Sequence, residues 1–218
     1  CILLPMEYQE LLKLIGRRAW FDLATVVQMA DEPRQQLQTQ LYRWCKAGRL
    51  LPLRRGMYAF AEEYRRVNID PAELANHIYS PSYLSLQWAL AYYGLIPEKT
   101  VTFTSVTTRE TKQFENDFGT FTYRHLKPDV FFGYQSLEMN GHDVRIAMPE
   151  KALLDLWYLE SGAWDEERMM EMRFQNVEML DMKRLATFAE RWSKPKLGKA
   201  IRAFTQVTTL EREGTVEL

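Results

Sequence analysis

The sequence predicts an α+β protein made of two regions, residues 1–70 and residues 71–218. Three observations predict this class. Apolar residues recur at helical spacing between residues 5 and 48, alternate with polar residues in short runs near the middle of the chain, and return to helical spacing towards the end. With 218 residues, of which 46% are hydrophobic, the chain is long enough to bury two cores. We therefore expect a helical first region and a mixed α/β second region that ends in a helical tail.

The first region contains three predicted helices, over residues 5–16, 20–31 and 31–48. Each segment places apolar residues three and four positions apart, which is the spacing of one helix face. Pro5 suits the first turn of the first helix, because a first-turn N–H has no partner within a helix. Asp22 is placed to cap the second helix. The apolar stripe of the third helix consists of Leu37, Leu41 and Trp44.

A β-hairpin with a basic tip is predicted in the segment RLLPLRRGMYAF, residues 49–60. Two short apolar runs flank a turn in which Gly56 can adopt a positive φ angle. Arg54 and Arg55 stand at the tip of this hairpin. Residues 43–55 contain five basic residues and no acidic one, although the net charge of the chain is only -1. This asymmetry indicates an anionic partner for the first region.

The face of the third helix opposite its apolar stripe is predicted to contact DNA. It contains no carboxylate, and its side chains suit a DNA groove. Gln can form two hydrogen bonds with the edge of an adenine, one through each group of its amide. Thr can contact a thymine methyl group or a phosphate, and Tyr, Arg and Lys can bind the phosphate backbone of DNA. The members of this face are Gln35, Gln38, Thr39, Tyr42, Arg43 and Lys46. Arg54 and Arg55 complete the predicted DNA-binding surface.

Three helices followed by a basic hairpin are typical of a winged helix-turn-helix, in which the hairpin is the wing. We therefore expect residues 1–70 to be a winged helix-turn-helix domain that binds double-stranded DNA. The alternative is a three-helix domain that docks on another protein. The acid-free helix face and the basic hairpin occur together, which favours DNA.

The second region is predicted to mix strands and helices. Residues 100–106 and 119–125 alternate apolar and polar side chains, as half-buried strands do. Asn140-Gly141 between two β-prone runs predicts a hairpin. Residues 62–73 are polar, and we interpret them as a linker. Helices are expected within residues 80–98, from Pro149 onwards, and over residues 170–180, 185–192 and 197–204.

Catalytic and metal-binding motifs are not evident. The three histidines, His77, His125 and His142, are far apart and have no cysteine beside them. The sequence has neither a glycine-rich phosphate loop nor a G-x-S-x-G elbow. Lys151 and Asp155 are four residues apart in a predicted helix, and we interpret them as an exposed pair. We expect no enzyme activity, no metal ion and no cofactor.

Membrane segments and disulfides are not expected either. The longest uncharged stretches are interrupted by polar residues and proline, so none provides the run of about 20 apolar residues that a membrane-spanning helix needs. The two cysteines, Cys1 and Cys45, form no disulfide framework. Both features favour a cytoplasmic protein.

A second candidate surface lies in the second region. Thr107, Thr108 and Arg109 follow a predicted strand, where a rigid sheet can present side chains, and with Arg124 and Lys127 they can form a polar surface. The alternative is that they are turn residues with an exposed arginine. The tail segment KPKLGKAIR is either a second anion contact or a solvated helix face.

The order of motifs resembles the AbiEi antitoxin family, regulators from bacterial abortive-infection systems that are classed as type IV toxin–antitoxin pairs. The resemblance covers roughly residues 20–160. It rests on the winged-helix pattern followed by SPSYLSLQWALAYYGLIP, TVTFTSVTTR, FGTFTYRHLKPDVFFGY and IAMPEKALLDLWYL.

This resemblance implies a function for each region. The first would bind the promoter of its own operon as a transcriptional autorepressor, and the second would counteract a nucleotidyltransferase toxin encoded beside it. In this family the antitoxin is not thought to form a stable complex with the toxin. The resemblance makes the candidate surface of Thr107, Thr108, Arg109, Arg124 and Lys127 the predicted antitoxin surface. The alternatives are a stand-alone winged-helix regulator whose second domain binds a ligand or protein and, third, a nuclease-like enzyme.

Overall fold

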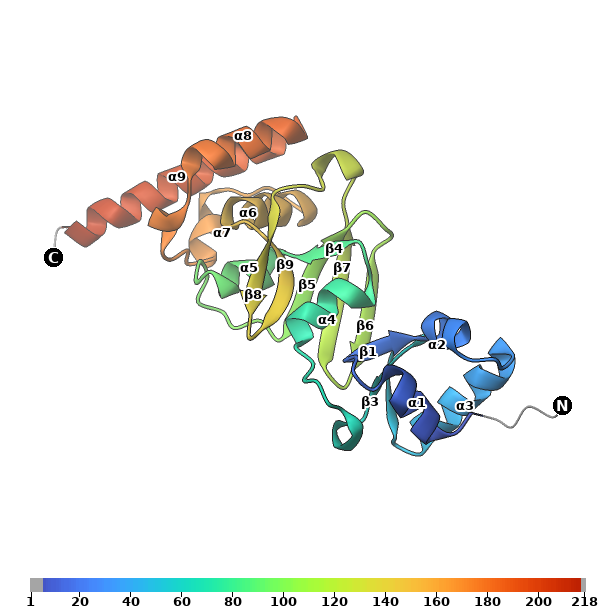
Figure 1. Ribbon diagram of the computed structural model, residues 1–218. Coiled ribbons are helices and arrows are strands. Elements are labelled where there is room, and N and C mark those ends of the chain that lie inside the picture. The colour runs from blue at the N-terminus through green and yellow to red at the C-terminus, as the bar shows by residue number, and fades with distance from the viewer. Residues whose placement is uncertain (1–5, 217–218) are drawn as a thin grey trace. The chain divides into compact units, whose positions relative to one another are not determined.

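The protein is α+β (Figure 1), and its computed structural model describes the backbone of residues 6–216 and the side chains of residues 6–209. Cys1, and Pro5 at the predicted start of the first helix, lie outside the described residues. The chain divides into two compact units. Unit 1 contains Cys1–Leu74 and Phe114–Gly119, and unit 2 contains Ala75–Gln113 and Thr120–Leu218. The first unit therefore extends past the expected boundary at residue 70, and it takes in a segment that the sequence did not assign to it.

Unit 1 combines three helices with a three-stranded antiparallel sheet. The three helices and the hairpin are confirmed, whereas the strand β1 was not expected. The sheet has the strand order β1-β3-β2, and β1 pairs with β3 through Asp22 and Met57 among other residues. The elements are α1 (Tyr8–Ile15), β1 (Trp20–Asp22), α2 (Leu23–Met29), α3 (Arg34–Lys46), β2 (Leu50–Arg54), β3 (Met57–Phe60) and a 3-10 turn at Glu62–Tyr64.

The core of unit 1 forms where the three helices meet the sheet. The predicted apolar stripe of α3 is confirmed, because Leu37, Leu41 and Trp44 are all buried. Tyr8 of α1 contacts the ring of Trp44 edge to face and donates a hydrogen bond from its hydroxyl to the Arg49 carbonyl oxygen. Burial raises the pKa of Tyr8 to about 12, so this side chain is neutral in the core at physiological pH. These contacts fix the rotation of α3 about its axis.

A six-stranded mixed sheet with the order β6-β7-β5-β4-β9-β8 lies mainly in unit 2, because only residues 114–119, at the β6–β7 turn, belong to unit 1. The predicted strands are confirmed as β5 and β7, which pair in parallel. The predicted hairpin is confirmed as β8 and β9, and Asn140 and Gly141 have φ angles of 53° and 81°. The sequence missed the short strand β4 and the polar strand β6. The bounds are β4 (Ser82–Leu84), β5 (Thr102–Thr107), β6 (Lys112–Asn116), β7 (Gly119–His125), β8 (Tyr134–Met139) and β9 (His142–Ala147).

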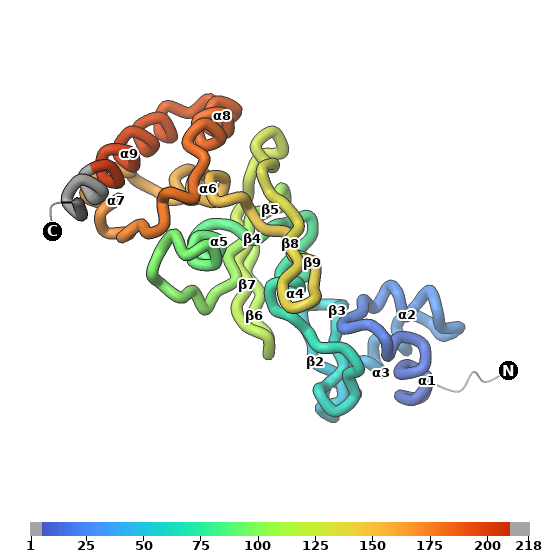
Figure 2. The backbone as a smooth tube through the Cα atoms, turned by 60° about the vertical axis from the view of Figure 1, so that its left-hand side comes forward, coloured from blue at the N-terminus to red at the C-terminus, as the bar shows by residue number. Residues whose placement is uncertain are grey.

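The helices of unit 2 gather mainly at one end of the unit (Figure 2). They are α5 (Leu86–Tyr92), α6 (Pro149–Leu159), α7 (Glu166–Glu171), α8 (Met182–Trp192) and α9 (Pro195–Val216), with 3-10 turns at Pro128–Val130 and Val177–Met179. One further helix, α4 (Pro71–Ile78), crosses the boundary between the units.

The predicted linker and one predicted helix differ from the structure. The presumed linker over residues 62–73 contains the start of α4, because the Asp70 carboxylate accepts hydrogen bonds from the Ala72 and Glu73 amides and so begins a helix. Residues 170–180 do not form one helix. Arg173 and Asn176 adopt positive φ angles of 48° and 51°, which end α7 and separate it from the next turn.

The interpretation of Lys151 and Asp155 as an exposed pair is also wrong. Every residue of α6 from Glu150 to Trp157 is buried, and the Lys151 ammonium forms an ion pair with the Asp155 carboxylate inside unit 2. The other carboxylate oxygen accepts hydrogen bonds from the hydroxyls of Ser85 and Tyr83, at 2.7 and 3.1 Å. Burial raises the pKa of Asp155 and lowers that of Lys151, while the partner of each opposes the shift.

Candidate nucleic-acid interface

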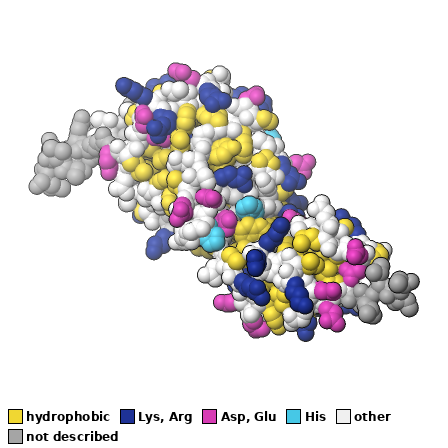
Figure 3. All heavy atoms as spheres, in the orientation of Figure 1, with side chains coloured by type: hydrophobic (Ala, Val, Ile, Leu, Met, Phe, Trp, Pro, Cys, Tyr) yellow, Lys and Arg dark blue, Asp and Glu magenta, His cyan; other side chains and the backbone are white. Residues whose placement is uncertain are grey.

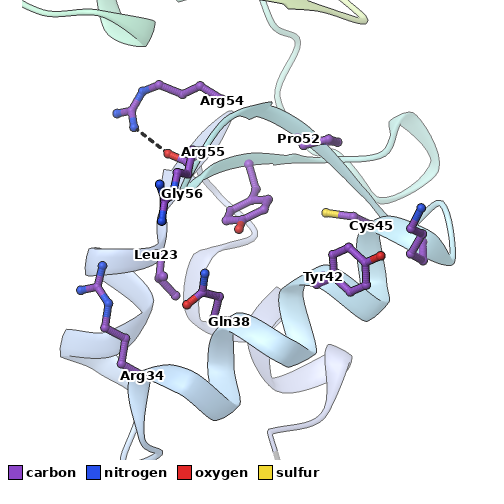
Figure 4. Close-up of a pocket in the computed structure, with 11 residues that line it drawn as sticks. Leu23, Arg34, Gln38, Tyr42, Cys45, Pro52, Arg54, Arg55 and Gly56 are labelled. Atoms are coloured by element: carbon purple, nitrogen blue, oxygen red, sulfur yellow. Dashed lines mark hydrogen bonds between the residues drawn. The ribbon is translucent and has the colours of Figure 1, made fainter.

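An open groove of about 850 Å³ runs along unit 1 between α3 and the β2–β3 hairpin (Figure 4). Arg34 and Gln38 project from α3 towards the hairpin, while Arg55 and Gly56 lie at the hairpin turn. The groove is lined by Leu23, Arg34, Gln38, Tyr42, Cys45, Lys46, Pro52, Arg54, Arg55, Gly56 and Tyr58. Three segments, at residue 23, residues 34–46 and residues 52–58, therefore meet at one concave surface.

The orientation of α3 follows from its buried stripe. Because that stripe packs into the core of unit 1, the opposite face of the helix must point to solvent. All six residues that the sequence assigned to this face are exposed: Gln35, Gln38, Thr39, Tyr42, Arg43 and Lys46. The predicted exposure of this face is confirmed.

The groove is strongly basic. Its lining contains four cationic side chains, Arg34, Lys46, Arg54 and Arg55, and none of the described residues that line it is Asp or Glu. The first turn of α3 is also free of acidic residues. The space-filling view shows Lys and Arg side chains interspersed with Asp and Glu on the visible face of unit 1 (Figure 3), so the acid-free character belongs to the groove lining and not to the whole unit. Cations on two walls of one concave surface reinforce each other's field and attract an anionic ligand.

The floor of the groove is less polar than its rim. Leu23 is buried, Tyr58 is half-buried, and burial raises the pKa of both the Tyr58 hydroxyl and the Cys45 thiol. Both groups are therefore neutral near pH 7 and add no negative charge. Tyr42 is 60% exposed, and the Lys46 ammonium lies 5.7 Å from the centre of its ring. The rim thus presents cations and an aromatic ring above an uncharged floor.

The hairpin turn is held against the start of α2. The amide of Leu23 donates a hydrogen bond to the carbonyl oxygen of Gly56 at 2.8 Å. Gly56 has a φ angle of 78°, a conformation that L side chains rarely adopt, which explains why a glycine occupies this turn. Arg54 forms an ion pair with Asp22 at 3.1 Å, and it also donates to the Arg55 carbonyl oxygen at 3.1 Å. Asp22 precedes α2 as predicted, but its side chain makes no capping hydrogen bond.

The structure brings together only part of the predicted DNA-binding set. Gln38, Tyr42, Lys46, Arg54 and Arg55 line the groove. The remaining residues, Gln35, Thr39 and Arg43, are exposed on α3 beyond its lining.

One of these residues has a local contact that the sequence did not indicate. The Thr39 hydroxyl donates to the Gln35 carbonyl oxygen within the helix at 3.0 Å. In this conformation its donor is used by the backbone of α3.

The sequence missed Arg34, which lines the groove from the first residue of α3. Asp31 and Glu32 closely precede Arg34, so the net charge of this segment did not indicate a basic site. The helical period was the available signal, because Arg34 lies one turn before Gln38 on the same side of the helix.

The predicted antitoxin surface is not one continuous exposed patch. Thr107 is the last residue of β5 and is buried, and its hydroxyl donates to the Pro81 carbonyl oxygen at 2.6 Å. Arg109 lies in the exposed loop after β5, and its guanidinium is 4.1 Å from the ring centre of Tyr79.

The other members of that surface differ in exposure. Thr108 and Arg124 are half-buried, and Arg124 donates to the Leu159 carbonyl oxygen at the end of α6 at 2.8 Å. Lys127 is exposed. Arg109 and Lys127 are therefore the best exposed cations of the set.

Neither a metal-binding cluster nor a membrane-spanning helix occurs in the part of the chain that the structure describes. Among the described side chains, those of residues 6–209, no group of three or more His, Cys, Asp or Glu could hold a metal ion. Over the described backbone, residues 6–216, every helix is too short or too polar to cross a membrane. In comparisons with known proteins, no protein-family model matches the chain, and no curated protein matches it either.

Proposed function

We propose that the protein is a DNA-binding transcriptional autorepressor and that unit 1 acts as a winged helix-turn-helix. The observation that carries this proposal is the groove, whose four cations come from two elements without an opposing carboxylate in its described lining. The order helix, strand, helix, helix and hairpin supports it, as does the strand order β1-β3-β2. In this proposal α3 is the recognition helix and the β2–β3 hairpin is the wing.

The groove residues divide into two kinds of DNA contact. Arg34 and Arg55 present guanidinium groups from opposite walls, which suits phosphates of the DNA backbone. Gln38 lies between them on the exposed face of α3, and its amide can pair with N6 and N7 of an adenine in the major groove. Arg34 and Arg55 would set affinity, whereas Gln38 would contribute to the choice of sequence.

We further propose that the protein is the antitoxin of a type IV toxin–antitoxin system and counteracts a nucleotidyltransferase toxin. The sequence resemblance to the AbiEi family supports this part. The distribution of charge agrees with a division of labour, because residues 1–70 contain 11 Lys and Arg against 8 Asp and Glu, and residues 71–164 contain 7 against 11. Unit 2 would then carry the antitoxin activity.

The DNA-binding proposal is tested by the salt dependence of binding. The full chain is titrated against a fragment of its own promoter and against random DNA at several salt concentrations. If the three exposed cations, Arg34, Lys46 and Arg55, neutralise phosphates, the slope of log K against log salt is about -2.7. Tighter binding to the promoter than to random DNA is also expected. A slope near zero would contradict the proposal.

The antitoxin proposal is tested by co-expression with the product of the adjacent gene. Restored growth is the expected result. If the adjacent product is not toxic, or if the full chain does not restore growth, a stand-alone regulator with a ligand- or protein-binding second unit becomes the better assignment.

A further inference from the structure

The two arginines at the hairpin tip have different surroundings. Arg54 reaches Asp22 with one nitrogen and the Arg55 carbonyl oxygen with the other, each at 3.1 Å. Its side chain is only 29% exposed. The Arg55 side chain is exposed, and within the described residues its guanidinium forms no hydrogen bond or ion pair. Neighbouring residues of the same type therefore have different contacts.

The contacts of Arg54 link the end of β2 to the start of α2. Asp22 belongs to β1 and directly precedes α2, whereas Arg54 ends β2. The hydrogen bond from the Leu23 amide to the Gly56 carbonyl oxygen joins the same two places. A planar guanidinium suits this position because it donates to two acceptors at once in a fixed geometry. Arg54 thus stabilises the turn that contains Arg55.

We propose that Asp22 and Arg54 form a clamp that positions the hairpin turn for DNA, and that Arg54 is not itself a phosphate ligand. This inference rests on the proposed function of the groove. A glycine-containing turn has many conformations to lose on binding, and a turn that is already fixed loses fewer. The clamp also neutralises the Asp22 carboxylate beside the basic groove. Asp22 and Arg54 are positioning residues, and Arg55 is the contact at the tip.

The clamp and a simple electrostatic role predict opposite signs for a change at Asp22. If Asp22 only repels DNA, its removal strengthens binding, because one negative charge disappears near the phosphates. If Asp22 positions the turn, its removal weakens binding in spite of that gain. Replacing Asp22 does not remove a cap from α2, because the Asp22 side chain makes no capping hydrogen bond.

The experiment uses the full chain with D22A, R54A, D22A/R54A and R55A, each titrated against the promoter fragment over a range of salt concentrations. D22A and R54A are each expected to weaken binding roughly two- to fivefold, the range of a partly exposed ion pair, and to leave the salt slope unchanged. The double variant should bind no more weakly than either single one. R55A should reduce the magnitude of the slope by about 0.9, the value of one phosphate contact.

Three binding results would overturn the clamp. These are tighter binding by D22A, a slope that falls by about 0.9 in R54A, and independent, additive losses in the double variant. D22N serves as the conservative variant, because its amide oxygen can still accept from Arg54, and it should recover much of the affinity lost in D22A.

A second readout without DNA separates failure of the clamp from failure of the proposed function. Hydrogen exchange of the Leu23 amide should become faster in D22A and R54A and stay unchanged in R55A. If exchange is unchanged in D22A and R54A, the clamp is overturned even when DNA binds. If the wild-type chain does not bind DNA, the proposed function fails, and with it the role of the clamp in DNA binding, while exchange still shows whether Asp22 and Arg54 hold the turn.

Discussion

Unit 1 and unit 2 place cationic side chains in different environments. Unit 1 places Arg34, Lys46 and Arg55 around an open groove, where solvent reaches them. Unit 2 encloses Lys151 completely, pairs it with Asp155, and places its ammonium 4.5 Å from the ring centre of Trp192. The same kind of side chain is therefore available to a ligand in one unit and used within the fold in the other.

Exposure, rather than charge alone, decides what a cation can do. An exposed guanidinium stays hydrated until a phosphate displaces the water. Its presence therefore costs little free energy of folding. A buried ammonium has lost its water and depends on its partner, and the pair therefore specifies one arrangement of the interior. We expect unit 1 cations to determine binding with little effect on stability, and Lys151 to determine stability.

The largest expected effect is on the buried pair. Asp155→Ala leaves the Lys151 ammonium without a counter-ion and the Ser85 and Tyr83 hydroxyls without their acceptor. We expect the free energy of unfolding of the full chain to fall by about 3–5 kcal/mol, because an unpaired charge remains buried. Chemical denaturation, followed by tryptophan fluorescence, measures the change.

The matched control removes both charges. The double variant Lys151→Met and Asp155→Leu replaces the pair by apolar side chains of similar size, and we expect it to be much more stable than Asp155→Ala. If Asp155→Ala lowers stability by less than about 1 kcal/mol, the range of an exposed pair, the pair does not have the energetic role that its burial indicates.

The next effect concerns the cations of the groove. Arg34→Ala combined with Arg55→Ala should reduce the magnitude of the salt slope by about 1.8, because two phosphate contacts are lost. Repression should be lost, whereas rescue from the adjacent toxin should persist if unit 2 carries the antitoxin activity. Gel-shift titrations and a promoter–reporter assay measure the two outcomes.

The control replaces two exposed lysines of unit 2, Lys99 and Lys183, by Ala. It makes the same change in net charge and should leave the slope unchanged. An equal decrease in both double variants would show that net charge, and not the groove, governs binding.

A smaller effect separates two glutamines of α3. Gln38 lines the groove, whereas Gln35 is exposed outside its lining. We expect Gln38→Ala to reduce the preference for promoter over random DNA by about 1–3 kcal/mol, the value of one bidentate base contact. Gln35→Ala should change that preference less. Equal losses on both DNAs would make Gln38 a positioning residue without a part in sequence choice.

Sequence periodicity predicted the parts of the fold that local spacing determines. Leu37, Leu41 and Trp44 defined the buried side of α3 and so its exposed face, and Asn140-Gly141 defined a hairpin. The strands β1 and β4 are three residues each, too short to show a period.

The environment of Lys151 could not be predicted in this way. Its spacing from Asp155 is that of an exposed helical pair, but it is covered by Trp192 and Phe132, which are distant in the sequence. The contact between Asp22 and Arg54 was missed for the same reason, because 32 positions separate the two residues. Such contacts depend on tertiary structure and leave no local pattern.

The smallest expected effect on stability belongs to the candidate antitoxin surface. Arg109→Gln with Lys127→Gln changes two exposed side chains and removes the contact of Arg109 with the Tyr79 ring, so we expect stability to change by about 1 kcal/mol or less. If these cations contact what the antitoxin must recognise, rescue from the toxin should nevertheless be lost. Thr107→Val is the matched contrast, because it removes a buried donor to the Pro81 carbonyl oxygen and should lower stability by about 1–3 kcal/mol. Growth rescue and thermal melting, measured on the same variants, distinguish the two cases. Full rescue by the stable double variant would remove Arg109 and Lys127 from the antitoxin surface.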